Sequence, residues 1–374
     1  MTTVLISGAG VAGTALAYWL RRFGFSPVIV EKAPALRVGG QAVDVRGVAV
    51  EVLRKMGLES AARSVRTTMR GMSMLDGQGN EQWRSEEVTL SAGRVDSDDI
   101  ELLREDLVQL MHAATDSVEY LFGDSIRALS ADETGVDVEF EHGAPRRFDL
   151  VIGADGLHSS TRDLVFGPER DYISHLGTYL SIFSCDNFLG LEDWQTWFNE
   201  GDVGGAVFTV RDNSQLRVNL GFITEPFNFD HRDTTANQRL LQARFSGLGW
   251  EVPRLLERMR RADDFYFDSM AQIHLPSWSK GPVALVGDAA CCASALSGQG
   301  TSVAMVGAYV LASELHRAEG EHRVAFERYE IRMRPFAEAN QRLATDPRDR
   351  HAEAENVAAV EKVKNAIDMT DLWV

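Results

Sequence analysis

Cysteine is scarce in this chain, and its three cysteines do not form a recognisable framework. Cys185 stands alone, whereas Cys291 and Cys292 are neighbours. This pattern excludes a set of structural disulfides and does not have the ligand spacing of a zinc site, so no metal is expected. The adjacent pair is interpreted as two small buried apolar side chains, with a vicinal disulfide or a reactive thiol as the alternative.

Long apolar runs and an excess of basic residues are also absent. No stretch reaches the roughly 18 apolar residues that a membrane span needs, and the start of the chain lacks a basic leader. The net charge of −17 is unfavourable for binding nucleic acid or an anionic membrane. We therefore expect a cytoplasmic monomer or homodimer of 374 residues that acts on a small molecule, with no nucleic acid and no membrane among its partners.

The first motif that is present is a glycine-rich turn between a strand and a helix. An apolar strand, Val4 to Ser7, leads into Gly8-Ala9-Gly10-Val11-Ala12-Gly13, and a helix is predicted from Thr14 to Phe23. The glycines permit a tight turn, close approach of a pyrophosphate, and packing of helix on strand. A second strand, Pro27 to Val30, ends at Glu31, where a carboxylate can bind a ribose hydroxyl. This pattern predicts an adenine-dinucleotide site.

Two later stretches repeat the order of strand, turn and helix. The apolar run Phe148 to Ile152 leads into the loop Gly153 to Arg162, and Pro282 to Val286 leads into the loop Gly287 to Gly300. The helix that follows, Thr301 to Leu315, is almost wholly apolar and is predicted to be buried. Its free N–H groups would stabilise negative charge. All three loops should meet at the carboxyl edge of one parallel sheet, where such sheets bind ligands.

A different pattern, with period-two alternation and many aromatic side chains, occupies the middle of the chain. The runs Ala206 to Arg211 and Leu216 to Phe222 alternate and predict a mostly antiparallel sheet with one apolar face. Most of the aromatic side chains are interpreted as sheet core, and others could line a cavity for a bulky ligand. Alternation does not say which face borders that cavity. The candidate substrate contacts are Arg211, Arg217, Asn219 and Phe222.

These segments predict an interleaved α/β chain. A dinucleotide-binding domain is expected from 1–68, 97–170 and 276–320, a β-sheet substrate domain from 69–96 and 171–275, and C-terminal helices from 321–374. A helix predicted from Ser97 to Ala114 carries Arg104, which by helical period alone is a solvated surface residue. Pro335 is expected to interrupt the helical pattern near the C-terminus.

The three loops in this order resemble those of the class A flavoprotein aromatic hydroxylases. These enzymes have the para-hydroxybenzoate hydroxylase fold, and the chain is most similar to the small group that includes the tetracycline-inactivating monooxygenase. The resemblance covers essentially the whole chain and implies an FAD-binding Rossmann-like domain, with Gly8 to Gly13 and Glu31 on the ADP half of FAD. It further implies that Arg104 reaches the ribityl and phosphate region, that Asp155-Gly156 serves FAD and NAD(P)H binding, and that Asp288 bonds the ribityl chain.

The resemblance also places Gly298-Gln299-Gly300 under the edge of the isoalloxazine ring. Two interpretations without a cofactor remain: Asp155 could cap the following helix and pair with Arg162, and the glycine pair after Arg37 could lie in an ordinary surface loop. The complete set of predicted cofactor-binding residues is Gly8, Gly10, Val11, Ala12, Gly13, Glu31, Lys32, Arg37, Gly40, Arg104, Asp155, Gly156, Arg162, Gly287, Asp288, Ala295, Gly298, Gln299, Gly300 and Thr301.

The activity that the resemblance implies is FAD-dependent and consumes NADPH or NADH. One oxygen atom of O2 would be inserted into an aromatic or polycyclic small molecule through a flavin C4a-hydroperoxide. Because the flavin carries this chemistry, no protein residue is predicted with certainty to be catalytic. The alternatives are Baeyer–Villiger insertion, epoxidation or dehydrogenation on the same fold, or a structural FAD in a protein that catalyses a non-redox step or binds a ligand. The chain departs from the family pattern at Cys291, Ala295 and Ser302, where the family usually has His, Pro and Asn.

Overall fold

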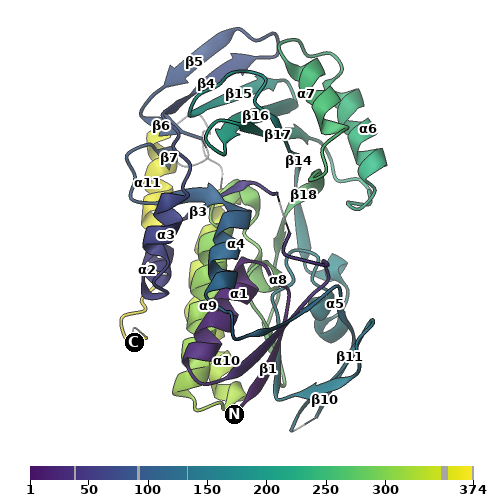
Figure 1. Cartoon of the computed structure of the whole chain (residues 1–374), viewed down its shortest axis with the longest axis vertical. Coiled ribbons are helices and arrows are strands. Elements are labelled where there is room, and N and C mark those ends of the chain that lie inside the picture. The colour runs from purple at the N-terminus through teal and green to yellow at the C-terminus, as the bar shows by residue number, and fades with distance from the viewer. Residues whose placement is uncertain (38, 91–92, 133, 347–352, 373–374) are drawn as a thin grey trace.

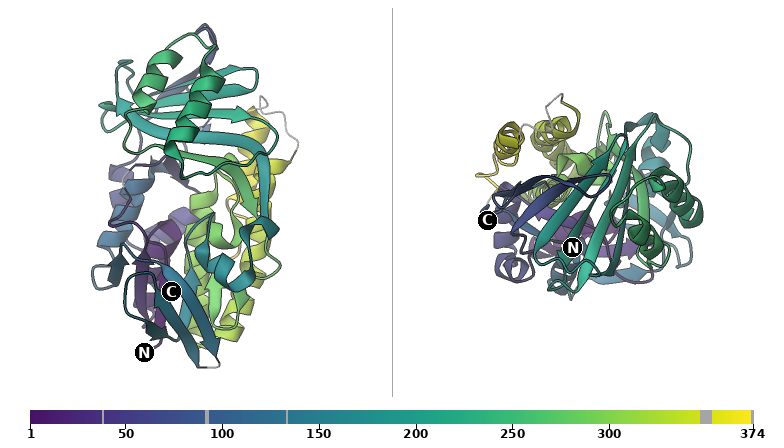
Figure 2. Two further views of the ribbon diagram at one scale, coloured as in Figure 1. Left: turned by 90° about the vertical axis from the view of Figure 1, so that its right-hand side faces the viewer. Right: turned by 90° about the horizontal axis from the view of Figure 1, so that it is seen from above.

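The structure is a computed structural model that describes residues 1–37, 39–90, 93–132, 134–346 and 353–372. A parallel sheet and a seven-stranded sheet occupy opposite ends of its longest axis (Figure 1). Figure 2 shows the same arrangement from the side, with two helices on the outer face of the seven-stranded sheet. None of the helices in the described ranges has the length and hydropathy that a membrane span requires.

The parallel sheet contains strands from three distant parts of the chain. Its order is β19 (Ser279–Lys280), β20 (Val283–Leu285), β13 (Leu150–Gly153), β1 (Thr3–Ser7), β2 (Ser26–Glu31) and β9 (Glu119–Phe122). Only β19 pairs antiparallel. These strands are apolar because both faces are covered. Helices α1 (Val11–Arg22) and α9 (Gly300–Arg317) pack on one face, and a small sheet of β10 (Ile126–Asp132), β11 (Gly135–Phe140) and β12 (Arg146–Phe148) covers the other.

The seven-stranded sheet joins two separate parts of the chain, which confirms the predicted interleaving of the two sheets along the sequence. Its order is β18 (Tyr266–Ile273), β14 (Ile173–Asp186), β17 (Gln215–Ile223), β16 (Val203–Val210), β15 (Trp194–Glu200), β4 (Gly71–Asp76) and β5 (Glu81–Ser85). All neighbours pair antiparallel except β15 with β4. Helices α6 (Thr234–Phe245) and α7 (Val252–Met259) cover its outer face. The domain boundaries themselves stay a prediction.

The inner face of this sheet is the one without α6 and α7. Along β17, Leu216, Val218, Leu220 and Phe222 join the apolar core beneath these helices. Because side chains alternate along a strand, Arg217, Asn219 and Gly221 lie on the inner face. The structure thus shows which residues of β17 lie on each face, and which face borders a ligand stays a prediction.

The predicted helix from Ser97 to Ala114 is wrong in its first part. The structure has β8 (Ile100–Leu103) followed by α4 (Arg104–Ala113), and β8 pairs antiparallel with β3 (Ala42–Val45). All four residues of β8 are buried, so this run shows neither helical nor alternating periodicity.

The remaining short elements are α2 (Val48–Lys55), α3 (Glu59–Ser64), β6 (Val88–Thr89), β7 (Gly93–Arg94), α5 (Ser160–Phe166), the 3-10 turn η1 (Glu169–Asp171), α8 (Asp288–Cys291), the 3-10 turn η2 (Ala295–Ser297) and α11 (Glu353–Val363).

The predicted interruption at Pro335 is also wrong. Helix α10 (His322–Thr345) continues through the proline. A proline inside a helix leaves the carbonyl four residues earlier without its usual donor. That carbonyl belongs to Ile331, which is 67% exposed, so water can replace the missing N–H group.

Candidate FAD site

The three predicted loops meet at one edge of the parallel sheet, and glycine makes their close approach possible. A Cβ atom at Gly8 would lie 2.6 Å from the carbonyl oxygen of Ala154, and one at Gly287 would lie 2.9 Å from the Cβ atom of Ala12. Both glycines have positive φ angles, 105° and 64°, which residues with a side chain rarely adopt. The turn after β1 therefore contacts the loop after β13, and the first turn of α1 contacts the loop after β20.

The N-terminus of α1 offers backbone donors to an anion. Gly10 precedes the helix, and a Cβ atom placed there would have no heavy atom within 4 Å. In the described chain no side chain caps this helix start. Glu31, only 8% exposed, accepts the N–H group of Ala9 at 2.8 Å and that of Ala33 at 2.9 Å. An open helix N-terminus beside a carboxylate suits the phosphate and ribose groups of a dinucleotide.

Arg104, at the start of α4, would border the other side of the predicted FAD groove, which the three loops define. A Cβ atom at Gly40 would lie 2.9 Å from Nε of Arg104, so glycine lets the Gly39-Gly40 turn lie against the guanidinium. Burial lowers the pKa of Arg104. No hydrogen bond or ion pair joins its guanidinium to another described residue, whereas the adjacent Glu105 pairs with Arg211 at 2.6 Å. A half-buried guanidinium without a protein partner fits a ligand phosphate.

Asp288 lies where the third loop meets the start of α9. A Cβ atom at Gly300 would be 3.9 Å from Oδ1 of Asp288. Burial raises the pKa of this carboxyl, and a hydrogen bond with the Cys292 thiol opposes the shift. No side chain caps α9 within the described residues, so the N–H groups of Gly300 and Thr301 remain available. Gln299 is wholly buried, and both polar atoms of its amide lack a partner in the part of the chain that the structure describes.

The loop before α9 lies against Arg46, a residue that was not predicted as part of the site. Arg46 follows β3 and forms an ion pair with Asp44 at 2.8 Å. A Cβ atom at Gly298 would lie 3.7 Å from its Nη1. The Ser302 hydroxyl, at a position where the family usually has Asn, accepts the Arg46 N–H group at 3.0 Å. Asp44 and Arg46 are two positions apart, so alternation along an extended strand puts both side chains on one face. This spacing was the sequence feature from which the pair could have been predicted.

The same loop has an unusual backbone at Ser294. Its φ angle is 70°, outside the common regions for a residue with a side chain. The 3-10 turn η2 follows immediately, and its first residue, Ala295, is exposed. Strained backbone of this kind persists where the surrounding structure holds it, often beside a ligand.

Asp155 and Arg162 do not pair with each other. Asp155 accepts the N–H and hydroxyl groups of Thr161, each at 2.9 Å, while Ser159 is the N-cap of α5. Arg162 is wholly buried and donates to the carbonyl oxygen of Ala289 at 3.2 Å. Both side chains therefore hold the second loop in place, and their contact with a cofactor stays a prediction.

The four candidate substrate residues have different surroundings. Arg211 is exposed and pairs with Glu105 and Asp106 of α4. Arg217 is 1% exposed and pairs with Glu105 at 3.3 Å and with Asp264 at 3.0 Å. Asn219 lies on the inner face, where its Oδ1 atom is buried without a partner among the described residues. Phe222 packs in the outer core under α6 and α7. Contact with substrate stays a prediction for all four.

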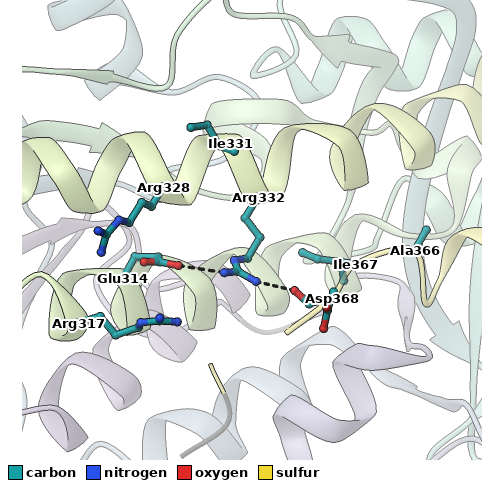
Figure 3. Close-up of a pocket in the computed structure, with 8 residues that line it drawn as sticks. All are labelled: Glu314, Arg317, Arg328, Ile331, Arg332, Ala366, Ile367 and Asp368. Atoms are coloured by element: carbon teal, nitrogen blue, oxygen red, sulfur yellow. Dashed lines mark hydrogen bonds and ion pairs between the residues drawn. The ribbon is translucent and has the colours of Figure 1, made fainter. Parts of the chain in front are cut away.

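A separate hollow of about 560 Å³ lies between α9, α10 and the segment 366–368 (Figure 3). Arg332 crosses it, 3.5 Å from Glu314 and hydrogen-bonded at 2.7 Å to the carbonyl oxygen of Asp368. Glu314 is roughly 20 Å along α9 from Gly300 at the helical rise per residue. This hollow is therefore distinct from the groove formed by the three loops.

Three glycine-bearing loops that meet at one edge of a parallel sheet are typical of a dinucleotide-binding protein. A family model described as an FAD binding domain matches residues 1–344. A flavin-dependent monooxygenase of Legionella longbeachae is 40% identical over 343 residues, which covers 91% of this chain and 87% of the relative. An uncharacterised protein of Mycobacterium tuberculosis is 52% identical over 347 residues, which covers 92% and 93%.

A solved structure agrees with these relatives. The tetracycline destructase Tet(51) superposes with a TM-score of 0.89 at 37% identity, and the match covers 98% of this chain and 99% of that one. The chain belongs to the FAD-binding domain family that includes the flavin-dependent monooxygenases. The resemblance stated from the three motifs is confirmed.

Proposed function

We propose that this protein is an FAD-dependent monooxygenase that uses NADPH or NADH and inserts one atom of O2 into an aromatic or polycyclic small molecule. The observation that carries the proposal is the convergence of the three loops with the open N-termini of α1 and α9 and with Arg104, whose guanidinium has no protein partner among the described residues. The similarity to flavin-dependent monooxygenases supports the oxygenation, and the likeness to a tetracycline destructase supports a polycyclic substrate.

The residues present fit FAD along the whole groove. Gly8 to Gly13 and Glu31 would hold the ADP half, and Arg104 would pair with the pyrophosphate. Asp288 would accept a ribityl hydroxyl. The first N–H groups of α9 would stabilise negative charge on the flavin ring. When bound there, FAD supplies hydride acceptance and oxygen activation.

A substrate would bind between the start of α9 and the inner face of the seven-stranded sheet. In the strand register, Trp197 lies opposite Ala206, and Gln195 lies opposite Phe208. The Trp197 indole N–H donates to Oε1 of Gln195 at 3.0 Å, which places both side chains on the same face. Flat apolar rings beside a few polar groups suit an aromatic ligand with polar substituents. One such group is the Asn219 oxygen, which has no partner in the part of the chain that the structure describes.

The proposal is tested by purifying the protein and measuring its flavin spectrum and its oxidation of NADPH and NADH in air. A panel of phenols and fused-ring compounds is added, and products formed under ¹⁸O2 are analysed by mass spectrometry. We expect faster nicotinamide oxidation with an accepted compound and one labelled oxygen atom in its product. An FAD-loaded protein that shows no oxygen-dependent turnover with either nicotinamide or dithionite would refute the proposal. An unlabelled, dehydrogenated product would favour the dehydrogenase alternative.

A further inference from the structure

A chain of hydrogen bonds connects the inner face of β18 with the segment around α5. The Tyr266 hydroxyl donates to Oδ2 of Asp268 at 2.9 Å. The same carboxylate oxygen lies 2.8 Å from Nε2 of His158, whose Nδ1 lies 2.9 Å from Oε1 of Glu169. These four side chains have no part in the FAD contacts proposed above, so their linear arrangement needs another explanation.

The inner end of this hydrogen-bonded chain lies near residues of the proposed FAD groove. Tyr266 pairs in register with Ile182, whereas its neighbour Phe267 belongs to the outer core under α6 and α7. Tyr266 is therefore on the inner face, and it is 45% exposed although α8 packs against its strand. It interacts electrostatically with Asp288 and Arg104, two of the residues that surround the groove.

The outer end of this hydrogen-bonded chain, at His158 and Glu169, reaches solvent. Asp268 in the middle is 1% exposed, whereas the side chain of His158 is 27% exposed and that of Glu169 is 25% exposed. The ring of His231 stacks on the His158 ring with centroids 4.1 Å apart. Protons can thus enter at His158, pass the buried carboxylate, and reach the phenol at the groove.

The charges around this hydrogen-bonded chain favour the protonated, imidazolium form of His158. Burial opposes the imidazolium, but hydrogen bonds to Asp268 and Glu169 outweigh burial and raise the pKa of His158 to about 9. The same hydrogen bonds keep the pKa values of both carboxyls below normal against burial. Other charged or titratable groups also face these side chains: His231 with its neighbours Asp230 and Arg232, Arg162 and Asp163 beside Glu169, and Cys292, Asp288 and Arg104 beside Tyr266.

We propose that His158, Asp268 and Tyr266 form a relay that carries a proton from solvent to the FAD groove. The inference rests on the proposed function, in which substrate, O2, NAD(P)H and one proton give oxygenated substrate, NAD(P)⁺ and water. When its O–H group turns from Oδ2 of Asp268 toward the groove, the Tyr266 hydroxyl gives its proton to the acceptor there, and the phenolate oxygen then takes a proton from Asp268. Asp268 takes its proton from Nε2 of His158, and solvent reprotonates the imidazole. One proton enters per turnover, and the relay returns to its starting state.

The first test is Tyr266→Phe, which removes the hydroxyl and keeps the ring. We expect kcat for oxygenation to fall by at least about tenfold, as for loss of a proton donor, with KM and FAD affinity unchanged. The wild-type kcat should decline above about pH 9, where His158 loses its proton, and Tyr266→Phe and His158→Gln should both lack this limb. The matched control is Tyr172→Phe, whose hydroxyl donates to the carbonyl oxygen of Phe166 outside the relay. It should match the wild type.

The second test needs no turnover. Histidine-selective NMR of the FAD-loaded protein should show His158 titrating near 9 in the wild type, and closer to the ordinary value of 6.5 in Asp268→Asn. Titration at the ordinary value in the wild type would overturn the relay. So would unchanged kcat and pH dependence in Tyr266→Phe when the wild type oxygenates its substrate. A wild type without oxygenation would instead overturn the proposed function, and the relay would fall with it.

Discussion

Asp288 offers the sharpest test of the cofactor groove. Its carboxyl group lies beside Gly300, at the start of α9, and forms a hydrogen bond with the thiol of Cys292. In Asp288→Ala a ribityl hydroxyl of FAD would lose its acceptor and stay buried. An unsatisfied buried polar group costs about 1–3 kcal/mol, so the Kd for FAD should rise by roughly fivefold to 150-fold.

Without FAD, replacing the Asp288 carboxyl by a neutral amide should make the folded protein more stable. Burial raises the pKa of Asp288 above its ordinary 3.8, so the folded state binds this proton more tightly than the unfolded chain does. The stability that the neutral carboxyl provides is therefore lost as pH rises from 3.8 through the raised pKa. Asp288→Asn carries no such charge. At neutral pH we expect the FAD-free Asp288→Asn protein to have a higher Tm than the FAD-free wild type.

Two measurements on the same preparations test the expected FAD affinity and the expected stability. Flavin fluorescence at limiting FAD gives the Kd, and thermal unfolding without FAD gives the Tm. Asp116→Asn is the control, because Asp116 is exposed near the far end of α4 and should change neither quantity. Unchanged FAD affinity in Asp288→Ala would refute the assignment of Asp288 to the cofactor. A lower Tm in Asp288→Asn would refute the account of its burial.

Three further predictions follow from the same groove. Arg104→Met should raise the Kd for FAD by about tenfold or more, since charged hydrogen bonds are worth about 1.5–3 kcal/mol, while the exposed Arg127→Met should not affect flavin fluorescence. Gly287→Ala should lower the Tm, because its positive φ alone costs about 1–2 kcal/mol and its Cβ would meet that of Ala12 at 2.9 Å. Burial raises the pKa of Asp44 to about 7 although Arg46 pairs with it. The wild type should therefore lose stability as the pH rises from about 4 to about 7, and Asp44→Asn should not. Urea unfolding of both proteins across this pH range measures the difference.

The sequence predicted the parts of the site that depend on local chemistry. Gly8 and Gly287 occupy backbone conformations and close approaches that favour glycine, so their motifs carry structural information by themselves. Likewise, the apolar run that became α9 has no polar face to direct toward water. Its burial therefore followed from composition alone.

Features that depend on tertiary partners were not predictable in this way. The run Ile100–Leu103 is buried on every side, and only the presence of β3 beside it makes it a strand. Arg46 belongs to the groove because the loop at Gly298 lies against it, although the two are far apart in the chain. The ion pair of Arg217 with Glu105 joins two sheet-and-helix units whose docking no local pattern describes.

The order of strands in the parallel sheet has a consequence for biosynthesis. β1 lies between β2 and β13, so one edge of this first strand has no partner until residue 153 has been made. At 5–20 residues per second, the wait after β2 is roughly 6–24 s. The α9 end of the groove comes later still, at Gly300. FAD can thus meet all three loops only after residue 300 has been made.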